Sequence, residues 1–137
     1  MSKHTFTRPH KIHFSECDPA GIVFYPQYFI LFNDLTESWI DSLLPEGYQG
    51  LILGRRIGMP TVRQDASVTA ISRFGDDVDL ELDVDHVGNR SMSLELRCVG
   101  HDGVLRMAAK QTIVTTSLDT HQAVPIPEDL KAAIERR

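Results

Sequence analysis

The sequence has no long apolar run, and it contains only two cysteines, Cys17 and Cys98, among 137 residues. A membrane-spanning helix needs about 20 consecutive apolar residues, and no stretch approaches that length. Residues 1–10 also lack the apolar segment that a secretory signal requires. We therefore expect a cytoplasmic protein with reduced thiols and no membrane contact.

Positive charge is also scarce, because 14 lysines and arginines stand against 19 aspartates and glutamates, for a formal net charge of −5. A general nucleic-acid-binding surface needs excess basic side chains to displace counterions from phosphates. The composition therefore argues against a nucleic-acid partner, while a local basic spot for one phosphorylated ligand stays compatible with it.

The six histidines are scattered, and none of them forms a recognisable metal-binding motif. His10 and His13 are three residues apart, which in an extended segment directs their side chains to opposite faces. The spacing rules for zinc ligands are not met, so we expect no metal site.

Length and composition fit one domain over residues 1–137, with 42% hydrophobic and 24% charged residues. A strand is predicted over Thr5–Ser15, followed by a turn-rich break at residues 16–21. A helix is predicted from about Tyr25 to Leu44, because Pro26 suits a first helical turn and apolar residues recur at three- and four-residue steps. Those apolar residues are Tyr28, Phe29, Phe32, Leu35, Trp39, Ile40 and Leu43. Because Ile30 and Leu31 fill the other side, the start of this helix is predicted to be buried nearly all round.

From Met59 onward, apolar residues alternate with polar ones, which indicates strands with one buried face. The first such segment is Ala66, Val68 and Ala70. A two-residue turn at Asp102-Gly103 places Cys98 opposite Met107, and a three-residue loop at 88–90 places Glu81 opposite Arg97. Apolar residues then face apolar residues across three antiparallel strands over about 77–117. Short helices are predicted at 48–57 and 127–137, so the fold class is α+β.

Asp18 lies in a tight loop immediately before the long helix. A helix N-terminus presents unpaired N–H groups and a partial positive charge, which can hold the oxyanion of an attacked carbonyl. A carboxylate one loop away can attack the carbonyl or activate water. Asp18 is equally explained as a turn residue that binds its own backbone, and spacing alone favours that simpler interpretation.

The segment Asp18-Pro19-Ala20-Gly21-Ile22-Val23-Phe24-Tyr25-Pro26, followed by Tyr28, closely resembles the hotdog-fold thioesterases of the 4-hydroxybenzoyl-CoA thioesterase family. The likeness is specific over residues 8–45. It implies a long helix wrapped by a five-stranded antiparallel sheet in the order 1-3-4-5-2. It also implies an acyl-CoA substrate with no further cofactor, and a homodimer that assembles into a homotetramer with sites at the dimer interface.

Residue by residue, the resemblance makes Asp18 the nucleophile or general base, and the Tyr25 N–H the group that polarises the thioester carbonyl. Many relatives carry histidine where this chain has Tyr25, which points to the branch acting on aromatic acyl groups. The likeness also implies substrate or CoA contacts. Those contacts are assigned to Gly21, Tyr28, Asn33, Met59, Asn89, Arg90 and Ser91. Asn33 replaces an expected acid and Met59 an expected polar residue, which leaves benzoyl and other aroyl groups open.

Other functions and residues stay as alternatives. The chain can instead hydrolyse short- or medium-chain aliphatic acyl-CoA, or bind acyl-CoA or an acyl carrier without catalysis. A hydratase on this fold is disfavoured because no histidine lies in the loop–helix segment. Cys17 lacks a histidine partner in the sequence, and Glu37 is expected on a solvated helix face. The acids from Asp77 to Asp85 are expected on a solvated or oligomer-facing strand face.

Two further features stay undecided on the sequence alone. Arg55 and Arg56 either reach ligand phosphates or form a plain surface pair. Gln111 falls on the apolar face of a strand, as a hydrogen-bonded core amide or as part of a ligand site.

Overall fold

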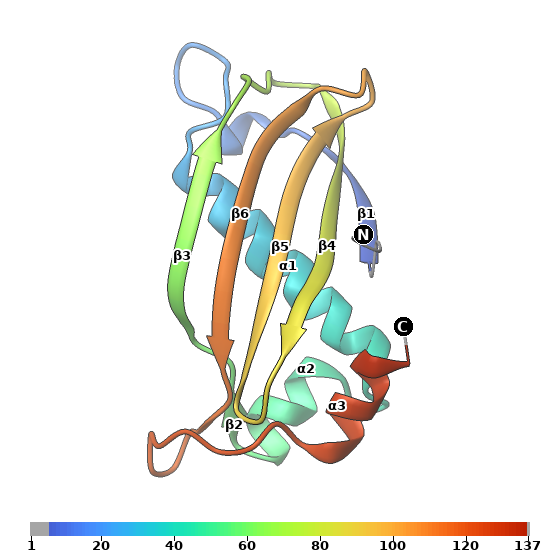
Figure 1. The fold of residues 1–137 in the computed structure, drawn as a ribbon. Helices are drawn as coiled ribbons and strands as arrows, with labels where there is room; N and C mark the ends of the chain where they lie inside the picture. The colour runs from blue at the N-terminus through green and yellow to red at the C-terminus, as the bar shows by residue number, and fades with distance from the viewer. Residues whose placement is uncertain (1–5, 137) are drawn as a thin grey trace.

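A computed structural model describes residues 6–136 as a long helix lying against one antiparallel sheet (Figure 1). The elements in chain order are β1 (Phe6–Lys11), a 3₁₀ turn (Phe14–Glu16), α1 (Pro26–Leu43), α2 (Gly47–Gln49), a π-helical turn (Gly50–Gly54), β2 (Ile57–Gly58), β3 (Thr61–Val68), β4 (Asp77–Val87), β5 (Ser91–Gly100), β6 (Leu105–Val114), β7 (Thr116–Ser117) and α3 (Glu128–Glu135). No helix within this part of the chain has the length and apolar character needed to cross a membrane.

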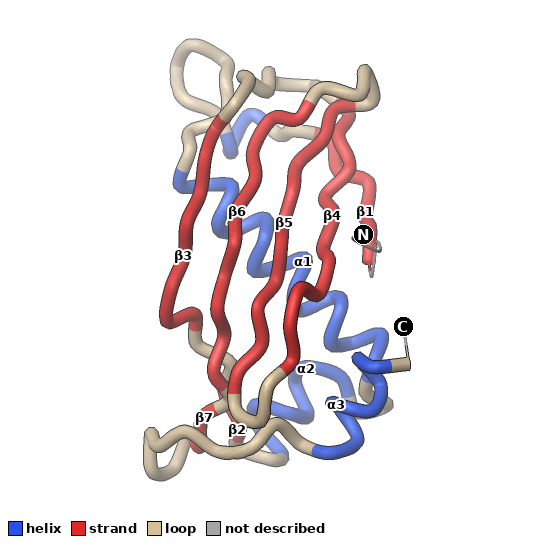
Figure 2. Tube along the Cα trace, viewed as in Figure 1, coloured by secondary structure: helices blue, strands red, loops and turns tan. Residues whose placement is uncertain are grey.

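The main sheet has five strands in the order β1-β4-β5-β6-β3, and β2 and β7 form a separate two-stranded sheet. The predicted order 1-3-4-5-2 is the same arrangement once the two-residue strand β2 is left out of the count. Helix α1 crosses one face of the sheet diagonally, and α2 and α3 gather at one end (Figure 2). The predicted α+β architecture is confirmed.

The predicted pairing of the central strands is confirmed. Cys98 lies opposite Met107, and Glu81 lies opposite Arg97. The turns differ from the prediction in length, since Gly100 N–H donates to the Val104 carbonyl and encloses three residues rather than two. A register shift after Cys98 absorbs the extra residue, so the core pairs are unaffected.

The β4–β5 turn shows the opposite change. Gly88 N–H donates to the Ser91 carbonyl and leaves a two-residue loop, Asn89-Arg90, rather than the predicted three-residue one. A register shift between Val84 and His86 compensates for it. Each bulge leaves one extra residue unpaired, so the ladder resumes in matched pairs on both sides of it.

The core lies between α1 and the inner face of the sheet. Helix α1 buries Tyr28, Leu31, Phe32, Leu35, Trp39 and Ile40. Alternate residues of β4, β5 and β6 meet them: Val78, Leu80, Leu82, Met92, Leu94, Leu96, Cys98, Met107, Ala109 and Ile113. The expectation that the start of α1 is buried all round is wrong, because Ile30 is 51% exposed.

Two strand predictions need correction. Strand β1 ends at Lys11 rather than Ser15, because the chain turns into the 3₁₀ segment; the predicted start at Thr5 lies outside the described residues. Strand β3 ends at Val68, and all its residues are exposed, including Ala66 and Val68, which were predicted to face the core. Strand β3 is an edge of the sheet, and both of its faces are open in residues 6–136.

The short helices fall where they are predicted. The connector after α1 contains α2 and the π-helical turn, and α3 covers Glu128–Glu135. The predicted C-terminal end at Arg137 lies outside the described residues.

Candidate active site

The loop that carries Asp18 is a closed turn between the 3₁₀ segment and α1. Asp18 N–H donates to the Ile22 carbonyl at 2.9 Å, and Gly21 N–H returns to the Asp18 carbonyl at 2.9 Å. Gly21 has φ of +78°, a conformation that glycine adopts without strain. The Asp18 side chain accepts the Ala20 N–H through Oδ1 at 2.8 Å. Asp18 is therefore a turn residue through one oxygen, while Oδ2 accepts no hydrogen bond from residues 6–136.

The N-terminus of α1 leaves one backbone donor free beside this loop. The neighbouring N–H groups of Phe24, Gln27 and Tyr28 donate to the carbonyls of Glu16, Phe24 and Tyr25. Pro26 has no N–H, and the Tyr25 N–H has no acceptor in the described part of the chain. A half-buried carboxylate and an unpaired N–H therefore lie at the same positive helix end.

A second segment, residues 71–76, holds the loop from the side. Val23 N–H donates to the Ser72 carbonyl at 2.9 Å, and Phe74 N–H donates to the Gly21 carbonyl at 2.8 Å. The Tyr28 hydroxyl donates to Ser72 Oγ at 3.0 Å, and Tyr28 is 1% exposed. Burial raises the pKa of this hydroxyl. The structure places Tyr28, expected to touch the ligand, in the core beneath the loop.

His10, His13 and Glu16 meet at the base of the loop, so the expectation that the two histidines point apart is wrong. The 3₁₀ turn at Phe14–Glu16 folds the chain back on the end of β1. His10 Nε2 lies 2.9 and 3.0 Å from the two Glu16 carboxylate oxygens. The His13 N–H donates to Glu16 Oε1 at 2.9 Å, and His13 Nδ1 lies 3.8 Å from Oε2.

These three side chains have the donor types of a zinc site, with ligand atoms within 4.8 Å of one another. Both oxygens of Glu16 nevertheless lie within hydrogen-bond distance of the His10 ring, and Oε1 also accepts the His13 backbone N–H. The Glu16 carbonyl also accepts the Phe24 N–H at 3.0 Å, across the base of the loop. Glu16 and His10 therefore anchor the base of the loop.

Cys17 is half-buried and its thiol donates to the His13 carbonyl at 3.5 Å. Burial raises the pKa of this thiol, and the neighbouring Glu16 and Asp18 carboxylates raise it further. The reactive thiolate is therefore disfavoured.

For the thioester hydrolysis that the sequence resemblance implies, replacing Cys17 by serine is expected to leave turnover within about twofold of the wild type, because a thiol held protonated is a poor nucleophile. The measurement is hydrolysis followed by absorbance of the thioester bond, which the protein's own thiols do not disturb. A loss of turnover of 100-fold or more, with an unchanged melting temperature, would assign Cys17 a direct role.

A cavity of about 440 Å³ brings together other predicted residues, between α1 and the β3–β6 pair. Asn33 and Met59, both expected to face substrate, line it together. Glu37, expected to be solvated, is exposed but also lines this cavity. Its remaining walls include Asp34, Thr36, Tyr48, Pro60, Thr61, Gln111 and Ile113.

Two polar side chains that line this cavity, Gln111 and Tyr48, are buried or half-buried. Gln111 is 5% exposed, and its Nε2 donates to Gln64 Oε1 at 2.5 Å, so the core-amide and ligand-site interpretations both apply. Burial raises the pKa of the Tyr48 hydroxyl, and the Glu37 carboxylate raises it further. No periodicity in the sequence marks Tyr48, which precedes an irregular helical turn.

Within one chain, Asp18 and the Met59 side of the 440 Å³ cavity lie toward opposite ends of strand β3. The Asp18 loop contacts residues 71–76, which follow the end of β3, whereas Met59 precedes its start. The eight residues of β3 span about 26 Å at the usual rise per residue.

The predicted CoA-binding turn, Asn89-Arg90-Ser91, also lies at the Met59 end, at the tip of the β4–β5 hairpin (Figure 1). Its backbone is fixed, because Thr115 N–H donates to the Arg90 carbonyl and Ile126 N–H to the Asn89 carbonyl. The Asn89 and Arg90 side chains are exposed, and Arg90 forms no ion pair within residues 6–136.

The alternative cations are already paired. Arg55 bonds to Glu46 at 2.6 Å and to Asp129 at 2.6 Å. These two carboxylates raise the pKa of the Arg55 guanidinium. Arg56 lies 3.2 Å from Asp119. Both arginines therefore stabilise the contact between the α1–β2 connector and the C-terminal part of the chain.

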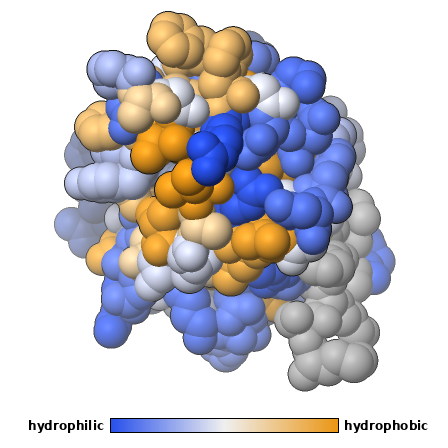
Figure 3. All heavy atoms as spheres, turned by 90° about the horizontal axis from the view of Figure 1, so that it is seen from above, coloured by the Kyte–Doolittle hydropathy of each residue, from blue (hydrophilic) through white to orange (hydrophobic). Residues whose placement is uncertain are grey.

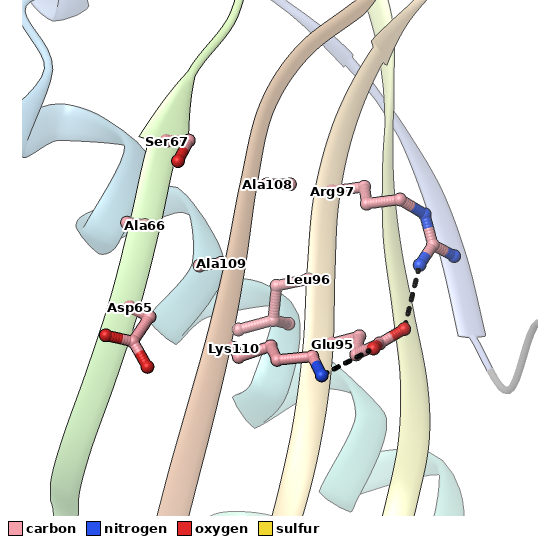
Figure 4. A pocket seen from close by; sticks show the side chains of 9 residues that line it. All are labelled: Asp65, Ala66, Ser67, Glu95, Leu96, Arg97, Ala108, Ala109 and Lys110. Atoms are coloured by element: carbon pink, nitrogen blue, oxygen red, sulfur yellow. Dashed lines mark ion pairs between the residues drawn. The ribbon is translucent and has the colours of Figure 1, made fainter.

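A groove of about 460 Å³ lies on the outer face of the sheet, across β3, β6 and β5 (Figure 4). Its charged side chains pair with each other: Glu95 lies 3.6 Å from Lys110 and 3.8 Å from Arg97. Arg97 also pairs with Glu81 and with Asp83, which is 1% exposed. The expectation of a solvated acidic row is therefore wrong for Asp83, which Arg97 covers.

The profile of the thioesterase-like superfamily matches residues 12–134, so the chain belongs to that superfamily and is a thioester hydrolase. A 4-hydroxybenzoyl-CoA thioesterase from Pseudomonas sp. (strain CBS-3) is 26% identical over 132 residues, covering 91% of this chain and 94% of that protein.

Solved structures agree on the hotdog fold. A thioesterase-superfamily protein from Jannaschia sp. CCS1 has a TM-score of 0.88 at 23% identity, and the match covers 100% of this chain and 97% of that protein. A gentisyl-coenzyme A thioesterase has a TM-score of 0.81 at 22% identity, with 93% and 98% coverage. A mutant 4-hydroxybenzoyl-CoA thioesterase complexed with 4-hydroxybenzoyl-CoA has a TM-score of 0.82 at 23% identity, with 93% and 96% coverage.

Proposed function

We propose that this chain hydrolyses an aromatic acyl-CoA thioester, using Asp18 as nucleophile or general base and the Tyr25 N–H as the oxyanion donor. The observation that carries the proposal is that two groups without a hydrogen-bond partner in residues 6–136, Asp18 Oδ2 and the Tyr25 N–H, both lie in the short segment that leads into α1. The 4-hydroxybenzoyl-CoA and gentisyl-CoA thioesterases that the chain resembles act on aromatic acyl groups.

The chemistry needs no group beyond the chain, substrate and water. The thioester oxygen accepts the Tyr25 N–H, which together with the helix dipole stabilises negative charge as the carbonyl is attacked. As a base, Asp18 takes a proton from water, and the resulting hydroxide adds to the carbonyl carbon. As a nucleophile, Asp18 adds directly and water then cleaves the anhydride. In both routes the carbon–sulfur bond breaks and the acid is released. In the base route the CoA sulfur takes the proton that Asp18 removed from water. In the nucleophile route CoA leaves as the thiolate, and the water that cleaves the anhydride supplies the proton that converts it to the thiol.

A panel of benzoyl-, 4-hydroxybenzoyl-, phenylacetyl-, butyryl- and palmitoyl-CoA tests this proposal directly. We expect the highest kcat/KM with a benzoyl thioester, because the cavity is lined by polar side chains such as Asn33 beside Met59, which suit an aryl ring better than an alkyl chain. A preference for butyryl-CoA would favour the aliphatic alternative. Absence of turnover with every ester would reject this set of substrates.

Self-association through β3 is part of the proposal. Strand β3 presents an unpaired edge, and exposed apolar side chains lie along it and beside it. These are Ile30, Val62, Val68 and Ile71, with Phe24 and Tyr25 at the loop. Figure 3 shows apolar side chains gathered on the end of the molecule that faces the viewer. A second copy is the partner whose edge matches this one in length and composition.

Two-fold pairing of β3 with the same strand of a second copy would also bring the Asp18 loop close to an Asn33–Met59 cavity. Antiparallel edges place the Val68 end of one strand beside the Thr61 end of the other. The Asp18 loop of one protomer then lies near the Asn33–Met59 cavity of its partner. We propose a homodimer with two composite sites, and further pairing into a tetramer that brings the Asn89–Ser91 turn to the CoA phosphates.

Arg90 is the cation proposed to contact those phosphates. Replacing Arg90 by alanine is expected to raise KM by about fivefold with kcat unchanged, which corresponds to about 1 kcal/mol for an exposed charge pair. The effect should shrink at high salt because exposed pairs are screened. Arg8, an exposed arginine on β1 at the other edge of the sheet, supplies the matched control. Equal KM values for the Arg90 variant and the wild type at low salt would remove the turn from the CoA site.

A further inference from the structure

Arg106 is a buried cation beside the Asp18 loop that the proposed chemistry does not use. It lies near the start of β6 and is 7% exposed. Nη1 donates to the Ile71 carbonyl at 3.2 Å and to Asp76 Oδ2 at 2.9 Å. Nη1 also lies 3.4 Å from Ser72 Oγ, and Nη2 donates to Asp102 Oδ2 at 3.0 Å. One guanidinium therefore ties residues 71–76 to the β5–β6 hairpin.

We propose that Arg106 is a positioning residue for Asp18, acting through residues 71–76; this inference rests on the proposed function. Those residues are the surface on which the Asp18 loop is built. Two backbone hydrogen bonds, from Val23 to Ser72 and from Phe74 to Gly21, join the two segments. Moving residues 71–76 therefore moves the backbone that flanks Asp18 on its C-terminal side.

Tyr28 extends the same network to the helix that supplies the oxyanion donor. Its hydroxyl donates to Ser72 Oγ, the atom that Arg106 also approaches. Tyr28 lies one turn after Tyr25, so a displacement of Ser72 reaches the start of α1. Arg106 therefore connects mechanically to both unsatisfied groups of the site, the Asp18 carboxylate and the Tyr25 N–H.

The network is built for an arginine. Asp76 accepts the Arg73 N–H at 2.8 Å as well as Arg106. The Arg73 N–H and the Arg106 guanidinium hold the pKa of Asp76 below its usual range, so the guanidinium keeps a charged partner. Lysine has one nitrogen in place of the planar fork and cannot reach acceptors on both sides.

Gly100 gives independent support, because the guanidinium occupies the space beside it. A Cβ at this position would clash with Arg106 Nη2 and with Asp102 Oδ1. Gly100 has no positive φ that would require glycine for its backbone. Its missing side chain therefore makes room for the Arg106–Asp102 pair.

Arg106→Lys tests the proposal by separating charge from geometry. We expect kcat to fall about 10- to 100-fold with KM within twofold, because a displacement of about 1 Å at a catalytic group has that cost. Amides of residues 17–25 should exchange hydrogen about tenfold faster. Asp76→Asn keeps the shape of the side chain that Arg106 contacts but removes its charge. It should also lower kcat and speed exchange of residues 17–25, and it replaces the lysine variant if that protein folds poorly.

Arg97→Lys is the matched control, because Arg97 also pairs with a buried carboxylate, that of Asp83, but lies on the outer face of the sheet. It should lower the melting temperature yet leave kcat and the exchange of residues 17–25 unchanged. The proposal is overturned if a folded Arg106→Lys protein keeps either wild-type kcat or wild-type exchange in this loop, or if both arginine variants lose kcat in proportion to stability.

The exchange measurement also separates this inference from the proposed function. A wild-type protein that hydrolyses no thioester would reject the function, while faster exchange in the Arg106 variant alone would still establish the positioning role. Unchanged exchange in a variant of an active enzyme rejects the positioning role alone.

Discussion

Asp18→Asn is expected to lower kcat by roughly 10³-fold or more, because asparagine can neither attack a thioester nor take a proton from water. The fold should survive, since the asparagine carbonyl can still accept the Ala20 N–H that Asp18 Oδ1 accepts now. We therefore expect a melting temperature within a few degrees of the wild type, and little change in KM. Hydrolysis of benzoyl-CoA under single-turnover conditions measures the chemical step without product release.

Asp41→Asn is a suitable control for this substitution. Asp41 Oδ1 also accepts a backbone N–H, from Tyr48 at 2.7 Å, but Asp41 lies at the far end of α1 from the loop. Its variant should keep kcat within twofold. If Asp18→Asn retained more than a tenth of wild-type turnover, Asp18 would be a turn residue only, as the Ala20 contact alone suggests.

Val62→Glu combined with Val68→Glu is expected to convert the proposed dimer into monomers and to reduce kcat/KM about 100-fold or more. Both valines are exposed on β3, at 61% and 51%. Glutamates at the two ends of an edge strand introduce like charges where two copies would meet. Activity should fall with the dimer because the composite site loses the partner's cavity, and with it the fixed placement of substrate against Asp18.

Light scattering at several protein concentrations, alongside turnover, measures both effects. Thr7→Glu on β1, the other exposed edge of the sheet, controls for added charge and should change neither mass nor rate. A wild-type protein that is monomeric at micromolar concentration and fully active would contradict the composite site. So would a fully active monomeric double variant.

The pairing of the central strands could be predicted from the sequence because it depends on local information. Alternation fixes which face each residue occupies, and a turn of known place fixes the register, so pairs such as Leu96 with Ala109 follow directly. The predicted lengths of the two turns are each wrong by one residue: the β5–β6 turn is one residue longer than predicted, and the β4–β5 turn is one residue shorter. Bulges near Cys98 and Val84 corrected for this, and no sequence pattern announces a bulge.

Tertiary contacts account for what the sequence did not predict. The meeting of His10 with Glu16 depends on a three-residue 3₁₀ turn that reverses a segment of strand-like composition. The contact of Arg106 with Asp76 could not be predicted either, because Arg106 lies in a strand and the sequence around it does not indicate a partner 30 residues away. Asp18 and Tyr25 could be proposed together from the sequence because one short segment carries both.

The opposite placement of Asp18 and the Asn33–Met59 cavity along β3 has a genetic consequence. In a two-fold dimer with shared sites, a chain defective at Asp18 and a chain defective in the cavity fail alone for different reasons. Mixed in one dimer, they place both lesions in one site and leave the other intact. Two inactive alleles of this protein would then complement each other, with up to half of normal activity restored per mixed dimer.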